Sequence, residues 1–284
     1  MGQIANFGDL PEEYSAQEQA RVVVVPVPYD RTSTWLKGAD KGPMAIIEAS
    51  AHMELYDIET DSEVYRKGIF TAKAVDGGLL PEDMIEEVKE QVRRYIENDK
   101  FVVVLGGEHS VSIGSVRAHI IKNANLTVMQ LDAHCDLRDE YEGSEYNHAC
   151  VMARIAELCP IMQVGIRSMD CSEKGAIDEN RIIFAREIHP NSDWIEKAIS
   201  KLSDKVYVTI DLDVFDSSIM PSTGTPEPGG LLWYDVLRLL KIVFEKRDVV
   251  GFDIVELCPS EGNKAPDFLA SKLIYKLLSY KFGN

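Results

Sequence analysis

The chain contains 284 residues, of which 45% are hydrophobic and 8% aromatic, a composition that excludes a disordered or fibrous protein. The formal net charge of −17 argues against a broad basic surface that follows nucleic acid or anionic lipid. An acidic surface suits a small cationic substrate, although solubility alone can explain it.

Eight short apolar runs rich in β-branched residues predict strands that are buried on both faces of a sheet. In chain order they cover residues 22–27, 70–75, 101–105, 126–131, 161–166, 181–184, 206–210 and 249–255. Most of the segments between these runs have apolar residues at helical spacing. The clearest example is an apolar stripe within residues 84–96, which follows Pro81 at a plausible helix start. This alternation predicts an α/β fold with parallel strands, either a three-layer sheet or a barrel. No repeat or long linker interrupts it, so we expect residues 1–284 to form a single domain.

The cysteines and the amino terminus indicate the compartment. The five cysteines are odd in number and form no C-x-x-C pair, which favours a reducing environment. Residues 1–19 contain several acids and lack the apolar core of a secretory leader, and no stretch is long enough to span a bilayer. We therefore expect a cytoplasmic protein with neither nucleic acid nor membrane as a partner.

Three groups of potential metal ligands directly follow predicted strands, at the strand ends where sites gather in such folds. The groups contain His109 after the third strand, Asp132, His134 and Asp136 after the fourth, and Asp211 and Asp213 after the seventh. Two glycines at positions 106 and 107 let the backbone turn tightly before His109. In an extended chain alternate residues point the same way, so D-x-H-x-D and D-x-D spacings can direct these side chains to one point.

Carboxylates and imidazoles gathered in this way are costly to bury unless cations balance them. The four aspartates carry four negative charges, which two divalent ions cancel, so the ligand count predicts a binuclear site. Oxygen-rich ligands with two imidazoles favour Mn(II) and leave Mg, Co, Ni or Zn possible. Cys135 lies between ligands but is expected to point away from them and pack. The residues alone therefore predict a pair of divalent ions in each subunit, with two Mn2+ favoured.

Two neighbouring divalent ions lower the pKa of a shared water, which makes hydrolysis the default chemistry. Hydrolysis of an amine-bearing substrate also needs a proton donor and an anion that holds a cation. His148 precedes a helix expected near Ala149 and could donate the proton, although a histidine at a helix start needs no such role. Glu256 follows the eighth strand at the same sheet edge, where a carboxylate can hold a guanidinium by paired hydrogen bonds.

Five segments together resemble the ureohydrolase family of arginases and agmatinases, and more closely its agmatinase branch. They are GGEHS at 106–110, DAHCD at 132–136, TIDLDVFD at 209–216, TGTPEPGGL at 223–231 and FDIVE at 252–256. The resemblance implies a three-layer α/β/α arginase-like fold with an eight-stranded, mainly parallel sheet, a bridged Mn(II) pair, and a homotrimer or homohexamer. Glu108, Ser217 and Ser222 depart from the usual pattern, but none of them is a ligand by this resemblance.

The resemblance also implies a role for each candidate residue. By motif position, one ion is held by His109, Asp132, Asp136 and Asp211, and the other by His134, Asp132, Asp211 and Asp213. His148 falls at the position of the proton shuttle, and Glu256 at that of the glutamate that receives the guanidinium. Asp213 and the metals are expected to stabilise the tetrahedral centre.

The family resemblance leaves the guanidino substrate open among agmatine, aminopropylagmatine, arginine and guanidinobutyrate. Arg138 stands where arginases carry an asparagine that holds the substrate carboxylate, and acids follow at positions 139, 140, 142 and 145. Such an acidic loop suits an ammonium tail, so we expect agmatine to be hydrolysed to putrescine and urea, as in polyamine synthesis, with aminopropylagmatine still open. The expected substrate-binding residues are Glu256, Arg138, Asp139 and Asn147.

Two other classes of function are also compatible with this fold type. A non-catalytic subunit would keep the fold and the oligomer without turnover, but the complete ligand set argues against it. A zinc deacetylase would need a different ligand set around one ion. Metal content after reconstitution separates these alternatives from a binuclear hydrolase.

Overall fold

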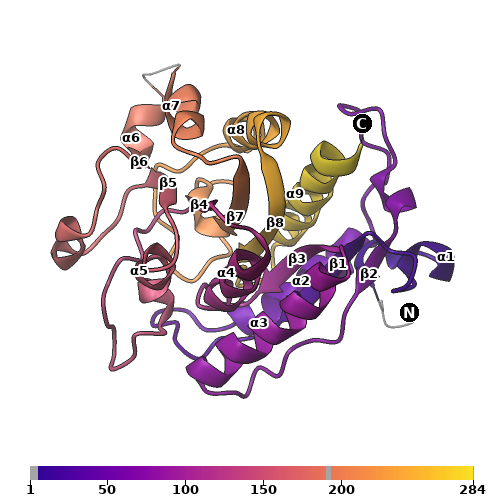
Figure 1. Ribbon diagram of the computed structural model, residues 1–284, viewed down its shortest axis with the longest axis horizontal. Helices are drawn as coiled ribbons and strands as arrows, with labels where there is room; N and C mark the ends of the chain where they lie inside the picture. The colour runs from indigo at the N-terminus through magenta and orange to yellow at the C-terminus, as the bar shows by residue number, and fades with distance from the viewer. Residues whose placement is uncertain (1–5, 190–192, 284) are drawn as a thin grey trace.

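The computed structural model describes residues 6–189 and 193–283 and contains an eight-stranded sheet (Figure 1). The strands are β1 (Val22–Val27), β2 (Ile69–Thr71), β3 (Phe101–Gly106), β4 (Leu126–Leu131), β5 (Ile161–Ile166), β6 (Ile182–Phe184), β7 (Lys205–Asp211) and β8 (Asp248–Val255). Their order is β2-β1-β3-β8-β7-β4-β5-β6, and every neighbouring pair is parallel. The predicted parallel sheet is confirmed, and it is open and not a barrel.

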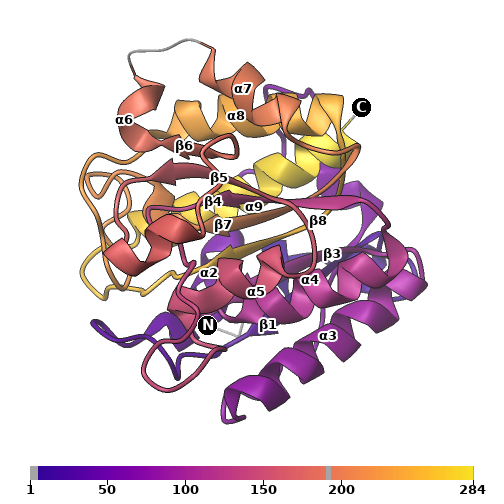
Figure 2. The same cartoon turned by 60° about the vertical axis from the view of Figure 1, so that its left-hand side comes forward.

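Helices cover both faces of this sheet (Figure 2). They are α1 (Glu12–Ser15), α2 (Gly42–Ser50), α3 (Pro81–Glu97), α4 (Val111–Lys122), α5 (Val151–Ala156), α6 (Ala185–Ile188), α7 (Trp194–Ser200), α8 (Trp233–Lys246) and α9 (Ala265–Phe282). Buried residues of α3, α4 and α5 pack against one face, and those of α2, α7, α8 and α9 against the other. The architecture is therefore the expected three-layer α/β/α arrangement.

The continuous apolar runs are explained by this double coverage. In β3, Val102 and Val104 face the core under α3 and α4, whereas Val103 and Leu105 face the core under α9 and α2. Because successive side chains of a strand point to opposite faces, a strand covered on both sides buries all of its side chains and is therefore mainly apolar. All six residues of β3 are buried, as in β1 and β4.

The second strand is shorter than predicted. The expected strand at 70–75 is reduced to β2 at the sheet edge, although the N–H groups of Ala72 and Val75 still donate to Val24 and Pro26. The carbonyl of Pro26 in β1 points toward this edge segment and accepts a hydrogen bond from it. Because proline has no N–H, β1 cannot donate a hydrogen bond to the segment at this position, and the regular pairing of the two strands ends.

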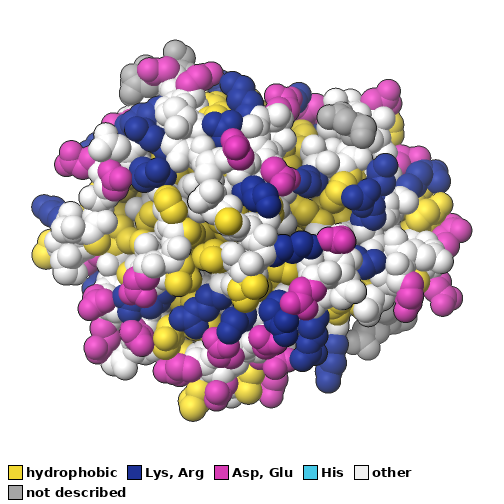
Figure 3. All heavy atoms as spheres, in the orientation of Figure 1, with side chains coloured by type: hydrophobic (Ala, Val, Ile, Leu, Met, Phe, Trp, Pro, Cys, Tyr) yellow, Lys and Arg dark blue, Asp and Glu magenta, His cyan; other side chains and the backbone are white. Residues whose placement is uncertain are grey.

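The surface mixes charges of both signs. On the face in Figure 3, acidic and basic side chains are interspersed around scattered hydrophobic atoms. Within the described ranges, no helix combines the length and the apolar character needed to cross a bilayer.

Candidate metal centre

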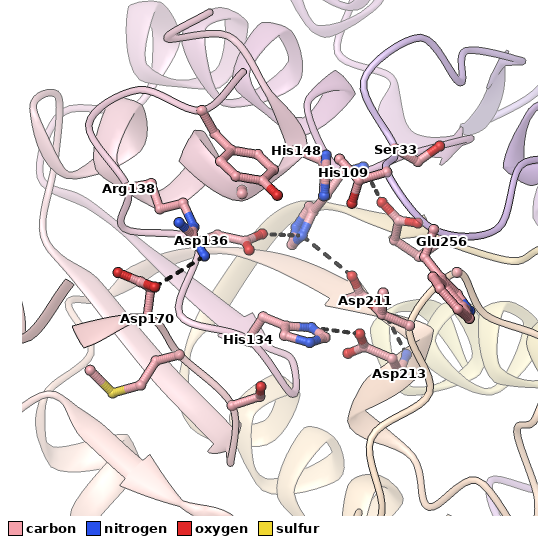
Figure 4. Close-up of a pocket in the computed structure, with 18 of the residues that line it drawn as sticks. Ser33, His109, His134, Asp136, Arg138, His148, Asp170, Asp211, Asp213 and Glu256 are labelled. Carbon is pink, nitrogen blue, oxygen red and sulfur yellow. Dashed lines mark hydrogen bonds and ion pairs between the residues drawn. The ribbon is translucent and has the colours of Figure 1, made fainter. Parts of the chain in front are cut away.

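The four central strands carry the predicted site. Strands β3, β8, β7 and β4 are neighbours in that order, and their carboxyl ends lie at one edge of the sheet. His109 follows β3, Asp211 ends β7, and Glu256 follows β8. Figure 4 shows His109, His134, Asp136, Asp211 and Asp213 grouped around a shared space, with Glu256 at its side. The topology thus joins side chains as far apart in sequence as His109 and Glu256, which are separated by 147 positions.

One group of ligands surrounds His109. The Nδ1 atom of His109 lies 3.2 Å from Oδ2 of Asp132 and 3.0 Å from Oδ2 of Asp136. The Oδ2 atom of Asp211 lies 3.6 Å from the same nitrogen. His109, Asp132 and Asp211 each present a ligand atom within 4.8 Å of the other two. All four residues are buried, so this group is a compact arrangement able to hold a cation.

A second group lies beside the first. The Nδ1 atom of His134 is 2.8 Å from Oδ2 of Asp213 and 3.7 Å from Oδ1 of Asp132. Together, Asp132, His134 and Asp213 present ligand atoms within 4.8 Å of one another. Asp132 belongs to both groups because Oδ2 faces His109 and Oδ1 faces His134. This is the placement that a carboxylate bridging two ions requires.

Backbone hydrogen bonds fix the direction of these carboxylates. The Asp213 Oδ1 atom accepts from Ala133 N at 2.9 Å, and its Oδ2 atom faces His134. The Asp211 Oδ1 atom accepts from Asp213 N at 2.8 Å, while its Oδ2 atom faces His109. Each of these aspartates therefore binds the backbone with one oxygen and presents the other to the site.

The expected extended conformation of these motifs is wrong in detail. Asp213 lies in a short 3-10 helix, Leu212–Val214, and Asp136 has a φ of 53°, in the left-handed region. Left-handed backbone in a non-glycine residue is strained and persists where surrounding contacts enforce it. The side chains converge because turns and cross-strand hydrogen bonds direct them, and not because alternate residues of a strand share a face.

The hydrogen bonds of His109 show that the site fits cations. The Thr209 hydroxyl donates to Oδ1 of Asp253 at 2.6 Å, so it accepts from Nε2–H of His109 at 2.9 Å. In a neutral imidazole the other ring nitrogen, Nδ1, is then unprotonated, and this buried atom has no hydrogen-bond partner. A lone pair facing three carboxylates is repulsive unless a cation lies between them. The fixed tautomer is also that of a histidine metal ligand oriented by a second residue.

The ionisation of the carboxylates leads to the same conclusion. Burial and the nearby Asp132 charge raise the pKa of Asp136 to about 7. Burial, followed by the charges of Asp213 and Asp132, raises the pKa of Asp211 well above its usual value. The protein alone therefore cannot keep all these carboxylates ionised at neutral pH, whereas two divalent cations would. The side chains present thus suit a binuclear site.

Two glycines allow His109 to reach the site. A Cβ atom at Gly107 would lie 2.0 Å from the backbone oxygen of Tyr29, and one at Gly106 would lie 2.4 Å from a side-chain carbon of Val111. A side chain at Gly107 would collide with the backbone after β1, and one at Gly106 would collide with α4. The paired glycines therefore serve close packing as well as turning.

A cavity of about 270 Å³ opens above the ligand groups. The predicted residues that line it are His109, His134, Asp136, Arg138, His148, Asp211, Asp213 and Glu256. Its outer wall comes from a loop after β1 and from loops after β4, β5 and β7, and includes Trp35, Tyr141, Met169 and Asp170. The cavity therefore places seven acidic or imidazole side chains of the prediction, together with Arg138, within reach of one small molecule.

His148 lies in the cavity wall at the start of the 3-10 helix His148–Cys150. Its backbone N–H donates to the Thr32 hydroxyl at 2.9 Å, and its ring meets that of Tyr141 edge-on. Burial lowers the pKa of His148 to about 4, although a backbone hydrogen bond at Thr32 raises it. A neutral imidazole is therefore the resting form of this residue.

Glu256 is a buried carboxylate in the same cavity. Its Oε1 atom accepts from His109 N at 2.8 Å, and its φ is 67°. Burial, then the charge of Glu108, raises the pKa of Glu256 well above the usual range. In the described part of the chain, Glu256 forms no salt bridge, so a cationic ligand would supply its missing charge partner.

The three other predicted substrate-binding residues differ in whether they reach the cavity. Arg138 lies at the rim, with its guanidinium 4.5 Å from the centre of the Tyr141 ring and 3.7 Å from Asp170. Asp139 is outside the cavity lining and binds Arg154 at 2.8 Å. Asn147 is buried and accepts from Ala149 N to cap the helix that begins at His148. Arg138 alone of the loop candidates therefore reaches the cavity.

Sequence reasoning missed several residues that organise the site. Thr209 and Asp253 orient His109, and Tyr207 donates to the other oxygen of Asp253 at 2.7 Å. Their only sequence signal is polarity within otherwise apolar strands, which marks buried hydrogen bonding without naming the partner. Thr32 gives no signal, because it lies in a polar loop far along the chain from His148.

Comparisons with known proteins agree with this geometry. The model of the arginase family matches residues 20–279. The N(1)-aminopropylagmatine ureohydrolase of Synechocystis sp. is 42% identical, with 95% of this chain and 92% of that protein aligned. The agmatinase of Pyrococcus horikoshii is 33% identical over 92% of each chain. The agmatine ureohydrolase structure of Thermoplasma volcanium superposes with a TM-score of 0.87 at 31% identity, covering 96% of this chain and 93% of that one. The chain therefore belongs to the arginase family, as its motifs indicated.

Proposed function

We propose that this protein is a ureohydrolase that uses two divalent ions to release urea from N(1)-aminopropylagmatine. The observation that carries the proposal is the pair of ligand groups sharing Asp132, with Glu256, which forms no salt bridge to any described residue, in the same cavity. Glu256 supplies the charge that a guanidinium needs, and the ligand groups lie beside it. A guanidino carbon held by Glu256 would therefore meet the metal site.

The proposed ligands follow the two groups. His109, Asp132, Asp136 and Asp211 would hold one ion, and His134, Asp132, Asp211 and Asp213 the other. The chemistry that such ions supply when bound is a water-derived nucleophile at neutral pH. We propose Mn(II), since the donors are carboxylates and imidazoles, and burial raises the pKa of the neighbouring Cys135 thiol so that no thiolate competes.

The protein side chains would carry the remaining steps. Glu256 would bind and orient the guanidinium, and Asp213, fixed by Ala133 N, would stand beside the tetrahedral centre. His148 would take up the proton that the attacking water releases and deliver it to the departing amine, because its ring lines the same cavity. Arg138 would border the substrate tail at the rim.

Relatives favour aminopropylagmatine over the agmatine expected from the sequence. Four relatives with 35–42% identity carry the name N(1)-aminopropylagmatine ureohydrolase, whereas three named agmatinase share 31–33%. The acidic loop that suggested agmatine is also engaged elsewhere, because Asp139 and Glu145 both bind Arg154. Agmatine, which would yield putrescine, stays the second candidate.

We also propose one domain, assembled as a homotrimer or homohexamer and located in the cytoplasm. Large apolar side chains on the surface support self-association, since Ile58 is 86% exposed and Tyr234 79% exposed. Sedimentation equilibrium of the Mn-loaded protein tests the oligomer. A concentration-independent monomer would contradict this part of the proposal.

A substrate panel tests the proposed activity. The Mn-loaded protein is assayed for urea release from aminopropylagmatine, agmatine, arginine and guanidinobutyrate, with chelator-treated protein as the control. We expect the highest kcat/KM for aminopropylagmatine, followed by agmatine. Faster urea release from arginine or guanidinobutyrate would contradict the substrate choice, and no release from any of them would contradict the function.

A further inference from the structure

The side chain of Arg167, which directly follows β5, binds the main chain of three segments at the edge of the metal centre. These segments are the end of β5, the turn after β7 and the loop that leads to α8. The guanidinium donates hydrogen bonds at 2.5 to 3.4 Å to six carbonyl oxygens, those of Gly165, Asp213, Val214, Phe215, Glu227 and Pro228. Within the described residues no carboxylate pairs with it. Arg167 therefore joins these segments through main-chain acceptors alone.

Arg167 completes the hydrogen bonding of the turn that carries the metal ligand Asp213. This residue lies in the 3-10 helix Leu212–Val214, and the last carbonyl groups of a helix find no partner inside it. Nη2 of Arg167 donates to Asp213 O at 2.5 Å. The Oδ2 atom of Asp213 lies 2.8 Å from Nδ1 of His134, as Figure 4 shows. Because a planar guanidinium holds its acceptors in a fixed geometry, the backbone that directs this carboxylate is fixed as well.

The backbone of Arg167 holds the other side of the same ligand group. Its N–H donates to Ala133 O at 2.8 Å. Ala133 lies between the ligands Asp132 and His134, and its own N–H donates to Oδ1 of Asp213 at 2.9 Å. Arg167, Ala133 and Asp213 thus form a closed ring of hydrogen bonds. This ring joins the loop after β4 to the turn after β7, the two segments that supply the second ligand group.

The charge of Arg167 acts against this positioning effect. The guanidinium and an ion held by the second ligand group would both lie next to Asp213, and like charges repel at short range. Removing the guanidinium should strengthen metal binding if its charge dominates, and should weaken metal binding if positioning dominates. The sign of a measured change therefore separates the two effects.

We infer that Arg167 is a positioning residue, which holds Asp213 against the loop after β4 and so keeps the second ligand group in the arrangement that its ion requires. The inference rests on the proposed function, in which one ion is bound beside His134 and Asp213. In the described chain, no hydrogen bond joins Arg167 to His109 or Asp136. The ion proposed beside those two residues should therefore depend much less on Arg167.

A variant without the guanidinium tests the inference through its effect on each ion. Arg167→Met keeps an extended side chain and removes the charge and all six hydrogen bonds. We expect the Mn(II) affinity of the site beside His134 to fall about 10- to 100-fold, as is typical when a residue that orients a metal ligand is lost. The affinity of the site beside His109 should stay near that of the parent. Competition with a chelator measures both affinities, and anomalous diffraction identifies the weakened site.

The matched control is Arg181→Met. Arg181 also donates to a main-chain carbonyl, that of Lys201 at 2.9 Å, but it lies just before β6, away from the ligand groups. This variant should bind both ions as the parent does. Weakened metal binding in Arg181→Met equal to that in Arg167→Met would overturn the inference, because the loss would then follow from any such arginine.

A second measurement does not depend on metal. Hydrogen exchange of the metal-free protein is followed by mass spectrometry in peptides that contain residues 132–136 and 211–215. Both peptides should exchange faster in Arg167→Met than in the parent, whereas peptides from β1 should keep their rates. Faster exchange throughout the sheet would show a general loss of stability and would contradict a positioning role.

The two measurements keep the inference separate from the proposed function. If the parent binds fewer than two ions, the proposed function loses its metal site, and hydrogen exchange still decides whether Arg167 holds the two segments. If the parent binds two ions and Arg167→Met binds both equally well or more tightly, the function stands and the inference is wrong. Equal weakening of both ions would also overturn it. Should Arg167→Met not fold, Arg167→Lys, which keeps the charge but loses the planar fork, replaces it with the same expected direction.

Discussion

Replacing the carboxylate of Glu256 by an amide should separate substrate binding from folding. Glu256→Gln keeps the side-chain volume and the oxygen that accepts from His109 N at 2.8 Å, so the local backbone is preserved. What it removes is the negative charge, together with one acceptor for a guanidinium. A hydrogen bond to a charged group contributes about 1.5–3 kcal/mol, which corresponds to a loss in kcat/KM of about 10- to 150-fold.

The same change should not destabilise the metal-free protein. Burial raises the pKa of Glu256, so its ionised form costs free energy in the folded state at neutral pH. An amide carries no such cost, and the melting temperature should stay equal or rise. Urea release and thermal unfolding are measured for the variant and for Glu87→Gln, an exposed control on α3. A kcat/KM equal to that of the parent, or a melting temperature that falls with activity, would refute the reasoning.

Two further predictions concern metal affinity and stability. Thr209→Val removes the hydroxyl that orients His109, so we expect the affinity for one of the two ions to fall about 10- to 100-fold. Competition with a chromogenic chelator measures both affinities. Equal weakening of both ions would count against this prediction. Lys276→Met leaves buried Asp57 without its cation and should lower the free energy of unfolding by about 2–3 kcal/mol at pH 7, measured in urea. Lys276 also binds Glu59. Burial raises the pKa of Glu59, but hydrogen bonds from Lys276 and Lys241 outweigh it and lower this pKa to about 2, below the value in the unfolded chain. The stabilisation by ionised Glu59 is therefore fully present above about pH 4.5. The difference from the parent should therefore shrink as the pH falls from about 4.5 towards 2, and a constant difference would contradict the assignment.

The sequence predicted the strands and the place of the site for one physical reason. Strands covered on both faces, such as β1 and β3, are apolar throughout, and groups of acidic and imidazole side chains appear where β3, β4 and β7 end. His109, Asp132 and Asp211 therefore stand out by position alone. Their strands lie together in the middle of the sheet, where β7 is next to β4 and only β8 separates β7 from β3, within the parallel sheet that the motif resemblance implied and the structure confirms.

The backbone conformations of the metal-ligand motifs could not be predicted from the sequence in this way. Asp136 adopts positive φ, and Asp213 lies in a 3-10 turn whose carboxylate accepts from Ala133 N, a partner 80 positions away. Such contacts between distant segments decide the turn, and spacing within one motif does not contain them. The role of Arg154 was hidden for the same reason, since it lies on α5 and draws Asp139 away from the cavity.

The central claim is most directly tested by locating manganese in a crystal of the Mn-loaded protein by anomalous diffraction. The ligand geometry predicts two ions per chain, one beside His109 and Asp136 and the other beside His134 and Asp213, with Asp132 between them. A single ion at full occupancy, or manganese bound away from these residues, would contradict the binuclear site on which the proposed hydrolysis depends.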